Sequence, residues 1–194
     1  MENFIFYLQQ GFFHVLDWKA YDHILFLVAL TVIYTFTDWK RILFLVTLFT
    51  LGHTLTLILS VYNIIRINAA YVEFLIPATI FVTALFNMFT AGKSSKKNKL
   101  SINLLFAFFF GLIHGLGFAG YFRMIVAANE DKLLPLLEFA LGIEGAQIVI
   151  VLLILILGYA VQTIFRFSKR DWVLVISSLI MGIVIPMLIK NKFW

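Results

Sequence analysis

The sequence contains no cysteine and few charged residues. Of its 194 residues, 13 % are charged and 62 % are hydrophobic, and only three are proline. Ordinary soluble domains are about a quarter charged, so a soluble fold of this size is excluded, because too few charges are present to cover its surface. The lack of cysteine excludes disulfides, thiolate metal sites and thiol nucleophiles.

Long apolar runs take the place of the missing charges, and the mean hydropathy is +1.00. A hydrocarbon core about 30 Å thick is crossed by roughly 20 helical residues. The runs are continuous rather than alternating, which favours helices over a transmembrane β-barrel. The sequence therefore predicts an all-α, polytopic membrane protein with one transmembrane domain over residues 1–194. Its six expected spans are about 21–37, 42–62, 70–91, 102–122, 134–165 and 172–189. We expect residues 1–17 to form a short amphipathic helix in the membrane interface.

Basic residues lie in the short breaks between these runs, a pattern typical of topology signals rather than of a nucleic-acid-binding face. Nine lysines and arginines fall on one side of the expected bundle and six on the other. The positive-inside rule then predicts that both termini lie outside. We expect a multi-pass protein of a bacterial inner membrane, with the lipid bilayer as its partner; the sequence leaves open whether it forms a homo-oligomer.

All four histidines of the chain lie in or beside expected spans; they are His14, His23, His53 and His114. At 1.5 Å per residue, His53 and His114 lie about 17 and 18 Å from the inner face. Asp22 and His23 open the first span at its outer edge, and His14 precedes it. The four imidazoles are therefore expected in the outer half of the membrane.

Carboxylates accompany them at similar depth. Glu138 and Glu144 fall about 6 and 15 Å from the outer face by the same count, and Glu144 must be protonated, paired or bound to a cation at that depth. Neutral imidazoles together with carboxylates are ligands for a divalent cation in the absence of cysteine. Four residues are candidate supporting groups around such a site: Asp17, Thr54, Glu138 and Gln147.

Four motifs carry a resemblance to a known family. They are Gly11-Phe-Phe-His14 followed by Asp22-His23-Ile-Leu-Phe-Leu, then Leu51-Gly-His53-Thr-Leu-Thr-Leu, Phe110-Gly-Leu-Ile-His114-Gly-Leu-Gly-Phe-Ala119 and Gly142-Ile-Glu144-Gly-Ala-Gln147. In this order they resemble the HupE/UreJ family of bacterial membrane proteins. Seven residues separate His14 from Asp22, a longer spacing than is common in that family.

The resemblance implies a nickel or nickel/cobalt permease linked to hydrogenase and urease maturation. It implies metal handling by six residues: His14, Asp22, His23, His53, His114 and Glu144.

Three functions remain open from the residues themselves. The first is a divalent metal permease for nickel, cobalt or zinc, whose ligand preferences overlap. The second is an intramembrane zinc-dependent hydrolase, in which imidazoles hold the metal and one position stays open for an activated water. The third is a structural or accessory membrane subunit whose polar groups tie helices together.

Overall fold

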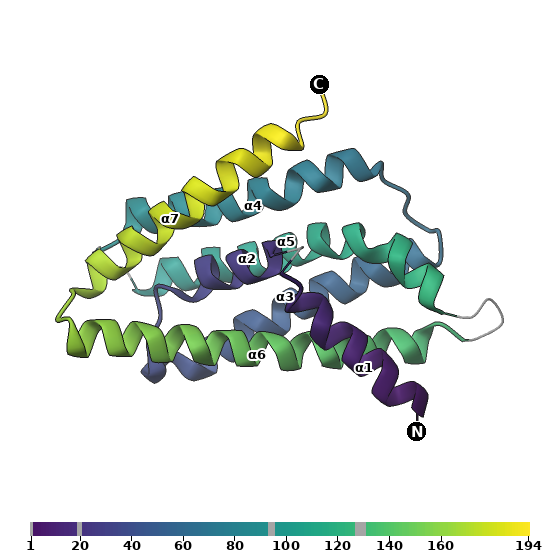
Figure 1. The fold of residues 1–194 in the computed structure, drawn as a ribbon, viewed down its shortest axis with the longest axis horizontal. Coiled ribbons are helices and arrows are strands. Elements are labelled where there is room, and N and C mark those ends of the chain that lie inside the picture. Colours follow the sequence, from purple (N-terminus) through teal and green to yellow (C-terminus); the bar gives the residue numbers. More distant parts are fainter. Residues whose placement is uncertain (1, 19–20, 93–95, 127–130) are drawn as a thin grey trace.

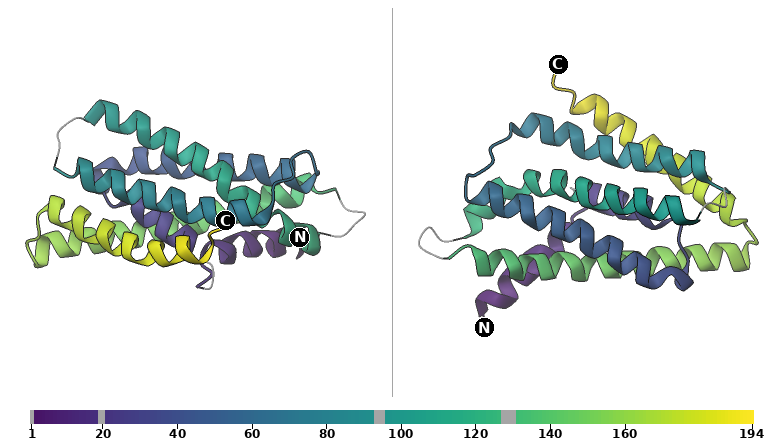
Figure 2. Two further views of the ribbon diagram at one scale, coloured as in Figure 1. Left: turned by 90° about the horizontal axis from the view of Figure 1, so that it is seen from above. Right: turned by 180° about the vertical axis from the view of Figure 1, so that it is seen from behind.

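The computed structural model describes residues 2–18, 21–92, 96–126 and 131–194. Within them every regular element is a helix, which confirms the all-α prediction. Its elements are α1 (Glu2–Val15), α2 (Asp22–Thr31), the 3₁₀ helix η1 (Phe36–Asp38), α3 (Trp39–Val61), α4 (Ala69–Thr90), α5 (Lys96–Ile125), α6 (Leu133–Ile164) and α7 (Lys169–Lys190). Figures 1 and 2 show the long helices lying side by side in a bundle.

Five helical segments are long and apolar enough to cross a membrane. They are Phe36–Val61, Ala69–Thr90, Ile102–Ile125, Leu133–Ile164 and Lys169–Lys190. These segments match the second to sixth expected spans. α6 is continuous over 32 residues. Side chains cap two of the helices, because Asn68 accepts from the backbone N–H of Ala70 and Ser168 from that of Asp171.

The first expected span differs from the structure. α2 has only 10 residues, or about 15 Å at 1.5 Å per residue, and is too short to cross alone. The chain leaves the helix at the β-branched residues Val32 and Ile33. The short helix η1 follows and is stabilised at its start, because the Asp38 carboxylate accepts from the N–H and the hydroxyl of Thr35. A single helix over 21–37 was therefore the wrong prediction.

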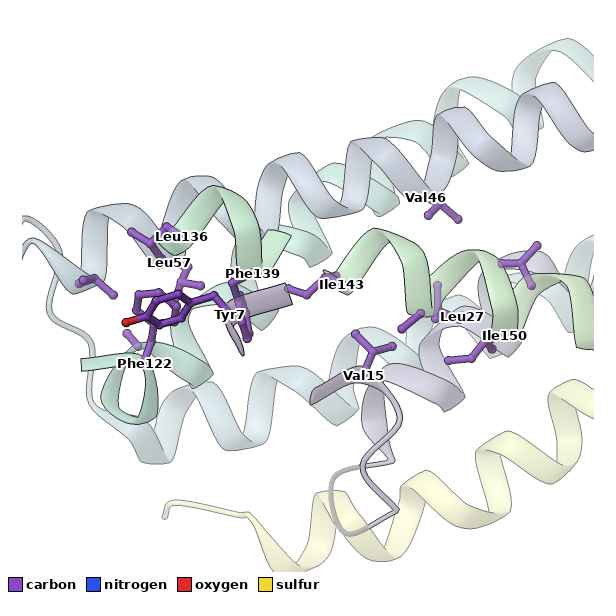
Figure 3. Close-up of a cluster of buried hydrophobic side chains, with 14 of the residues drawn as sticks. Tyr7, Val15, Leu27, Val46, Leu57, Phe122, Leu136, Phe139, Ile143 and Ile150 are labelled. Atoms are coloured by element: carbon purple, nitrogen blue, oxygen red, sulfur yellow. The ribbon is translucent and has the colours of Figure 1, made fainter. Parts of the chain in front are cut away.

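The amino-terminal helix packs closely against α6. α1 crosses the first half of α6 at Gly11 and Gly142, where a Cβ on either glycine would collide with a carbonyl oxygen of the other helix. Val15, at the end of α1, is fully buried with Leu27 and Ile143 (Figure 3). The opposite face of α1 exposes apolar side chains such as Phe13. One face of α1 is therefore packed on α6, and the other face is exposed.

Together α1 and α2 run from one end of the bundle to the other (Figure 1). Tyr7 of α1 packs against Phe122, where α5 approaches its end. Val32, directly after α2, clusters with Trp172 and Val173 at the start of α7. We call the end of the bundle near Phe122, where α5 ends and α6 begins, the pocket end. The opposite end, near Trp172, carries residues 36–41 and 165–170, and we call it the basic end. The two short helices thus form one broken path, interrupted near the middle of the bundle.

Both termini lie toward the pocket end. The carboxyl-terminal Phe193 packs on Tyr71 and Phe74, near the start of α4, and Asn191 donates to the carbonyl of Glu73.

α3 and α5 form the tightest helix pair of the interior. Gly52 on α3 lies against the carbonyl of Phe108, and Gly111 and Gly115 on α5 lie against the carbonyls of Phe49 and His53. Small residues let helix backbones approach closely in a membrane. The Thr56 hydroxyl donates across this interface to the carbonyl of Leu112, at 2.7 Å. This close contact fixes His53 and His114 on neighbouring helices at the same level.

Candidate metal centre

Three imidazoles meet at the break between α1 and α2. His14 is in the last turn of α1, His23 is the second residue of α2, and His53 lies in the middle of α3. The ring centroids of His14 and His23 are 4.6 Å apart, and those of His53 lie 6.0 and 5.9 Å from them. One ligand nitrogen from each residue lies within 4.8 Å of the other two. We call these residues the imidazole cluster.

The three ligand nitrogens of the cluster lie slightly farther apart than in a metal site and need only a small movement toward one another to bind an ion. An ion bonded to imidazole nitrogens at about 2.0–2.1 Å holds them roughly 3.4 Å apart in tetrahedral geometry. Nitrogens within 4.8 Å of one another therefore need to approach by no more than about 1.4 Å to reach that geometry. Rotation of the side chains about χ1 and χ2 covers such a distance.

Four ring nitrogens of the cluster are buried and have no protein partner. This holds for Nε2 of His14, Nε2 of His23 and both ring nitrogens of His53. His53 is 0 % exposed and His23 is 4 % exposed. A buried polar atom without a hydrogen bond costs about 1–3 kcal/mol, and such atoms in a native structure usually mark a bound ion or water. Several unsatisfied nitrogens directed into one small volume fit a cation that needs imidazole ligands.

Asp22 holds the ring of His23 in place. Its Oδ1 lies 3.0 Å from Nδ1 of His23 and accepts from the His23 backbone N–H at 2.7 Å. A carboxylate bonded to one imidazole nitrogen fixes the tautomer and leaves the other nitrogen as the ligand. The negative charge also lies at the amino-terminal end of α2, where the helix dipole favours it. The geometry therefore places Asp22 behind His23, outside the three-residue cluster.

His114 adjoins the cluster from α5. Its ring centroid lies 5.2 Å from that of His23, and its Nε2 lies 3.3 Å from Oγ1 of Thr79. The Thr79 hydroxyl donates to the carbonyl of Ile76, so its oxygen is free to accept from Nε2 of His114. The buried Nδ1 of His114 has no hydrogen-bond partner. His114 is thus a fourth imidazole beside the site, oriented by a threonine that sequence reasoning did not single out.

Glu144 lies in a different place from the imidazoles. Its Oε1 accepts from the Thr47 hydroxyl at 2.5 Å, between α6 and α3. Gln147 accepts from the Thr50 hydroxyl in the same interface, at 2.9 Å. The depth predicted for Glu144 did not specify which face of α3 it meets. His53 points toward α1 and α2, whereas Thr47 and Thr50 point toward α6.

The remaining predicted supporting groups are scattered. Thr54 follows His53, and its buried hydroxyl has no partner. Asp17 is exposed just after α1, and Glu138 is 8 % exposed in α6. Neither carboxylate belongs to the cluster of described residues that are spaced for a metal.

A cavity of about 1290 Å³ connects the cluster with the pocket end. His14, His23 and His114 line it, and His53 is not among its lining residues. Asp17, Glu73, Arg66 and Arg123 contribute charges of both signs to its wall. At about 30 Å³ per water molecule, the cavity admits a fully hydrated ion. A cation entering it therefore meets His14 and His23 before it reaches His53.

The apolar helices and the buried histidines define a multi-pass helical membrane protein with a candidate metal centre. The family model described as HupE / UreJ protein matches residues 1–191. The chain therefore belongs to the HupE/UreJ family, which is associated with metal transport. Comparisons with curated proteins and with solved structures gave no match.

Proposed function

We propose that the protein is a permease for a divalent transition metal of the nickel or cobalt type. The observation that carries this proposal is the imidazole cluster with its unsatisfied nitrogens, which adjoins a cavity lined by His14 and His23 and open at one end of the bundle. His14, His23 and His53 are the proposed ligands. Asp22 orients His23, and His114 supplies a further nitrogen beside the site. Membership of a family associated with metal transport supports the same function.

The broken path of α1 and α2 also supports transport. Many transporters place their ion sites near the middle of the membrane, where discontinuous helices end. Helix ends there provide ligands and free backbone groups that a continuous helix does not. The cluster lies at such an interruption, since His14 ends one short helix and His23 begins the next. We propose that α1 and α2 together make the sixth crossing of the membrane.

We propose that the pocket end faces the outside of a bacterial inner membrane and the basic end faces the cytoplasm. This orientation follows from the excess of lysine and arginine expected on the cytoplasmic side. In it the cavity opens outward, so the ion enters from the periplasmic or extracellular side.

Nickel, cobalt and zinc ions all accept imidazole nitrogen as a ligand. The affinity of such a site rises from Co²⁺ through Ni²⁺ to Cu²⁺ and is lower for Zn²⁺ than for Cu²⁺. The ligands therefore define the transported ion only as a divalent transition metal that binds imidazole. Direct competition among these metals for the purified protein identifies which one is bound best.

The decisive experiment measures binding and uptake on the same preparations. Protein purified without chelator is analysed for metal content and then reconstituted into liposomes for uptake of Ni²⁺ or Co²⁺. We expect bound metal and uptake in the natural protein, and loss of both in His53→Ala. Thr83→Val is a matched control, because it removes a buried hydroxyl that bonds only to its own helix. Unchanged metal content in His53→Ala, accompanied by a lower melting temperature, would instead indicate the structural or accessory role.

One observation favours a second candidate, the intramembrane zinc-dependent hydrolase. Three imidazoles leave a coordination position open, and the adjoining cavity has room for an organic substrate. Catalytic zinc sites have three protein ligands and activate water at the fourth position. A preparation that holds its metal, never releases it into liposomes and cleaves a lipid or peptide would establish this function in place of the permease.

A further inference from the structure

A layer of phenylalanines lies next to the imidazoles on the side of the basic end. Three histidines on three different helices each have a phenylalanine about one helical turn closer to that end. The pairs are His23 and Phe26 on α2, His53 and Phe49 on α3, and His114 and Phe110 on α5. At 1.5 Å per residue, each phenylalanine lies about 4.5–6 Å beyond its histidine. We call Phe26, Phe49 and Phe110 the phenylalanine layer.

The rings of this layer contact one another and the neighbouring imidazoles. Phe26 stacks on Phe49 with the ring centroids 4.8 Å apart, and the ring of Phe110 lies 6.0 Å from that of Phe26. The ring of His114 lies 5.3 Å from both Phe26 and Phe49. Phe26 and Phe49 are 0 % exposed. The layer is therefore closed where these two rings meet.

The cavity that opens at the pocket end stops at the imidazoles. His23 and His114 line it, whereas none of the three phenylalanines is among its lining residues. One further turn toward the basic end, Leu30 on α2 and Leu45 on α3 are buried as well. A cation bound to the imidazoles thus faces two successive apolar layers in that direction. Because a charge in apolar surroundings is costly, the ion does not pass while these side chains stay together.

The short helix α2 connects the layer with the metal ligands. Phe26 contacts both other rings of the layer, and His23 lies three residues before it on the same helix. The last turn of α2 is attached to α4, because the side-chain amide of Asn87 donates to the carbonyl of Ala29 at 2.6 Å. A displacement of α2 would remove Phe26 from the layer and His23 from the cluster together.

We propose that the phenylalanine layer is the inner gate of the permease, and that its separation limits the rate at which the ion leaves toward the basic end. This inference rests on the proposed permease function. Hydrophobic constrictions close pathways in membrane proteins because they exclude water. With a ligand and a gate residue on one short helix, opening of the gate also loosens the hold on the ion.

The test measures binding of Ni²⁺ by the purified protein and its initial rate of uptake into liposomes, for Phe49→Leu, Phe110→Leu and the natural protein. Leucine stays apolar but removes the ring contacts that close the layer. We expect an unchanged dissociation constant and an uptake rate about two- to tenfold higher, the factor that corresponds to the loss of one aromatic pair. Phe110 is only half-buried, so Phe110→Leu is the milder of the two variants.

Phe122→Leu is the matched control. Phe122 is also 0 % exposed, but it packs on Tyr7 at the pocket end, on the other side of the imidazoles. We expect this variant to have a lower melting temperature and the natural uptake rate. A rise in uptake as large as in Phe49→Leu would overturn the gate, because loosened packing anywhere in the bundle would then suffice.

The other outcomes separate this inference from the proposed function. If His53→Ala leaves bound metal unchanged, the permease proposal itself fails. If His53→Ala abolishes binding and uptake while Phe49→Leu and Phe110→Leu transport at the natural rate, only the gate is overturned. Weaker binding together with slower uptake in both variants also overturns it, because the rings would then serve only to support the imidazoles.

Discussion

Asp22 and His23 form a pair in which the carboxylate contacts its neighbour twice, through Nδ1 of the ring at 3.0 Å and through the backbone N–H at 2.7 Å. This double contact directs Nε2 of His23 toward the other imidazoles. The aspartate therefore acts on a metal through the histidine that it orients.

Asp22→Asn tests that relationship. The amide keeps the size of the side chain but loses the charge that makes His23 a better ligand. We expect metal affinity to fall by about 10- to 100-fold, the usual effect of removing a group that supports a ligand. Titration of the purified protein with Ni²⁺ gives the dissociation constant. An unchanged constant would show that Asp22 does not act through His23, and a loss as complete as in His53→Ala would make it a direct ligand.

Thr79→Val tests how His114 is positioned. Valine removes the oxygen that accepts from Nε2 of His114, so the ring is no longer held in one orientation. We expect metal affinity to fall about tenfold and Thr79→Ser, which restores a hydroxyl, to recover most of it. The same titration measures both variants. Equal affinity in Thr79→Val and the natural protein would mean that His114 takes no part in binding.

Gly11→Ala tests the packing of α1 on α6. The added methyl group meets the carbonyl of Phe139, and such overpacking costs typically about 1–3 kcal/mol. Because α1 carries His14, both the melting temperature and the metal affinity are expected to fall.

Gly182→Ala is the matched control for that substitution. Gly182 is also helical, but a Cβ there meets no atom within 4 Å, and alanine favours a helix by up to about 1 kcal/mol over glycine. We therefore expect Gly182→Ala to be neutral or stabilising. Destabilisation of equal size in both variants would contradict the close contact between α1 and α6.

Adding metal is expected to stabilise the protein. A ligand that binds only the folded state at 100 times its dissociation constant contributes about 2.7 kcal/mol. The melting temperature in detergent should rise on addition of Ni²⁺ and return to its starting value with excess chelator. His53→Ala should show no such rise. A rise of equal size in that variant would place the bound metal elsewhere.

The long helices were predictable because a run of about 20 apolar side chains is long enough to cross the hydrocarbon core, where the backbone must satisfy its own hydrogen bonds in a helix. The end of α2 at Thr31 was not, because residues 24–34 are almost all apolar and Val32, directly after the helix, packs on Trp172 and Val173, which are distant in the sequence. His14 illustrates the same point. Its long spacing from Asp22 is accommodated by the break, which returns the chain to the cluster.

The depth counted along the helices did not predict the contact of Glu144 with Thr47, which lies six residues before His53 on α3. Counting residues placed Glu144 near the level of the histidines, but the turn of α3 separates the face that carries His53 from the face that carries Thr47. Thr79 gave no signal in the sequence, since threonines within membrane helices commonly bond to their own backbone. Its second contact, with His114, exists only because α4 packs beside α5.

The interruption between α1 and α2 also divides the proposed ligands by their mechanical support. His53 is held by a long helix locked to α5 through glycines, whereas His14 is carried on a short amino-terminal helix attached chiefly to α6. A modest displacement of α1 would therefore withdraw one nitrogen from an ion and leave the α3–α5 pair unchanged. Movement of α1 therefore changes the position of His14 independently of His53. A tag fused ahead of Met1 would alter that movement.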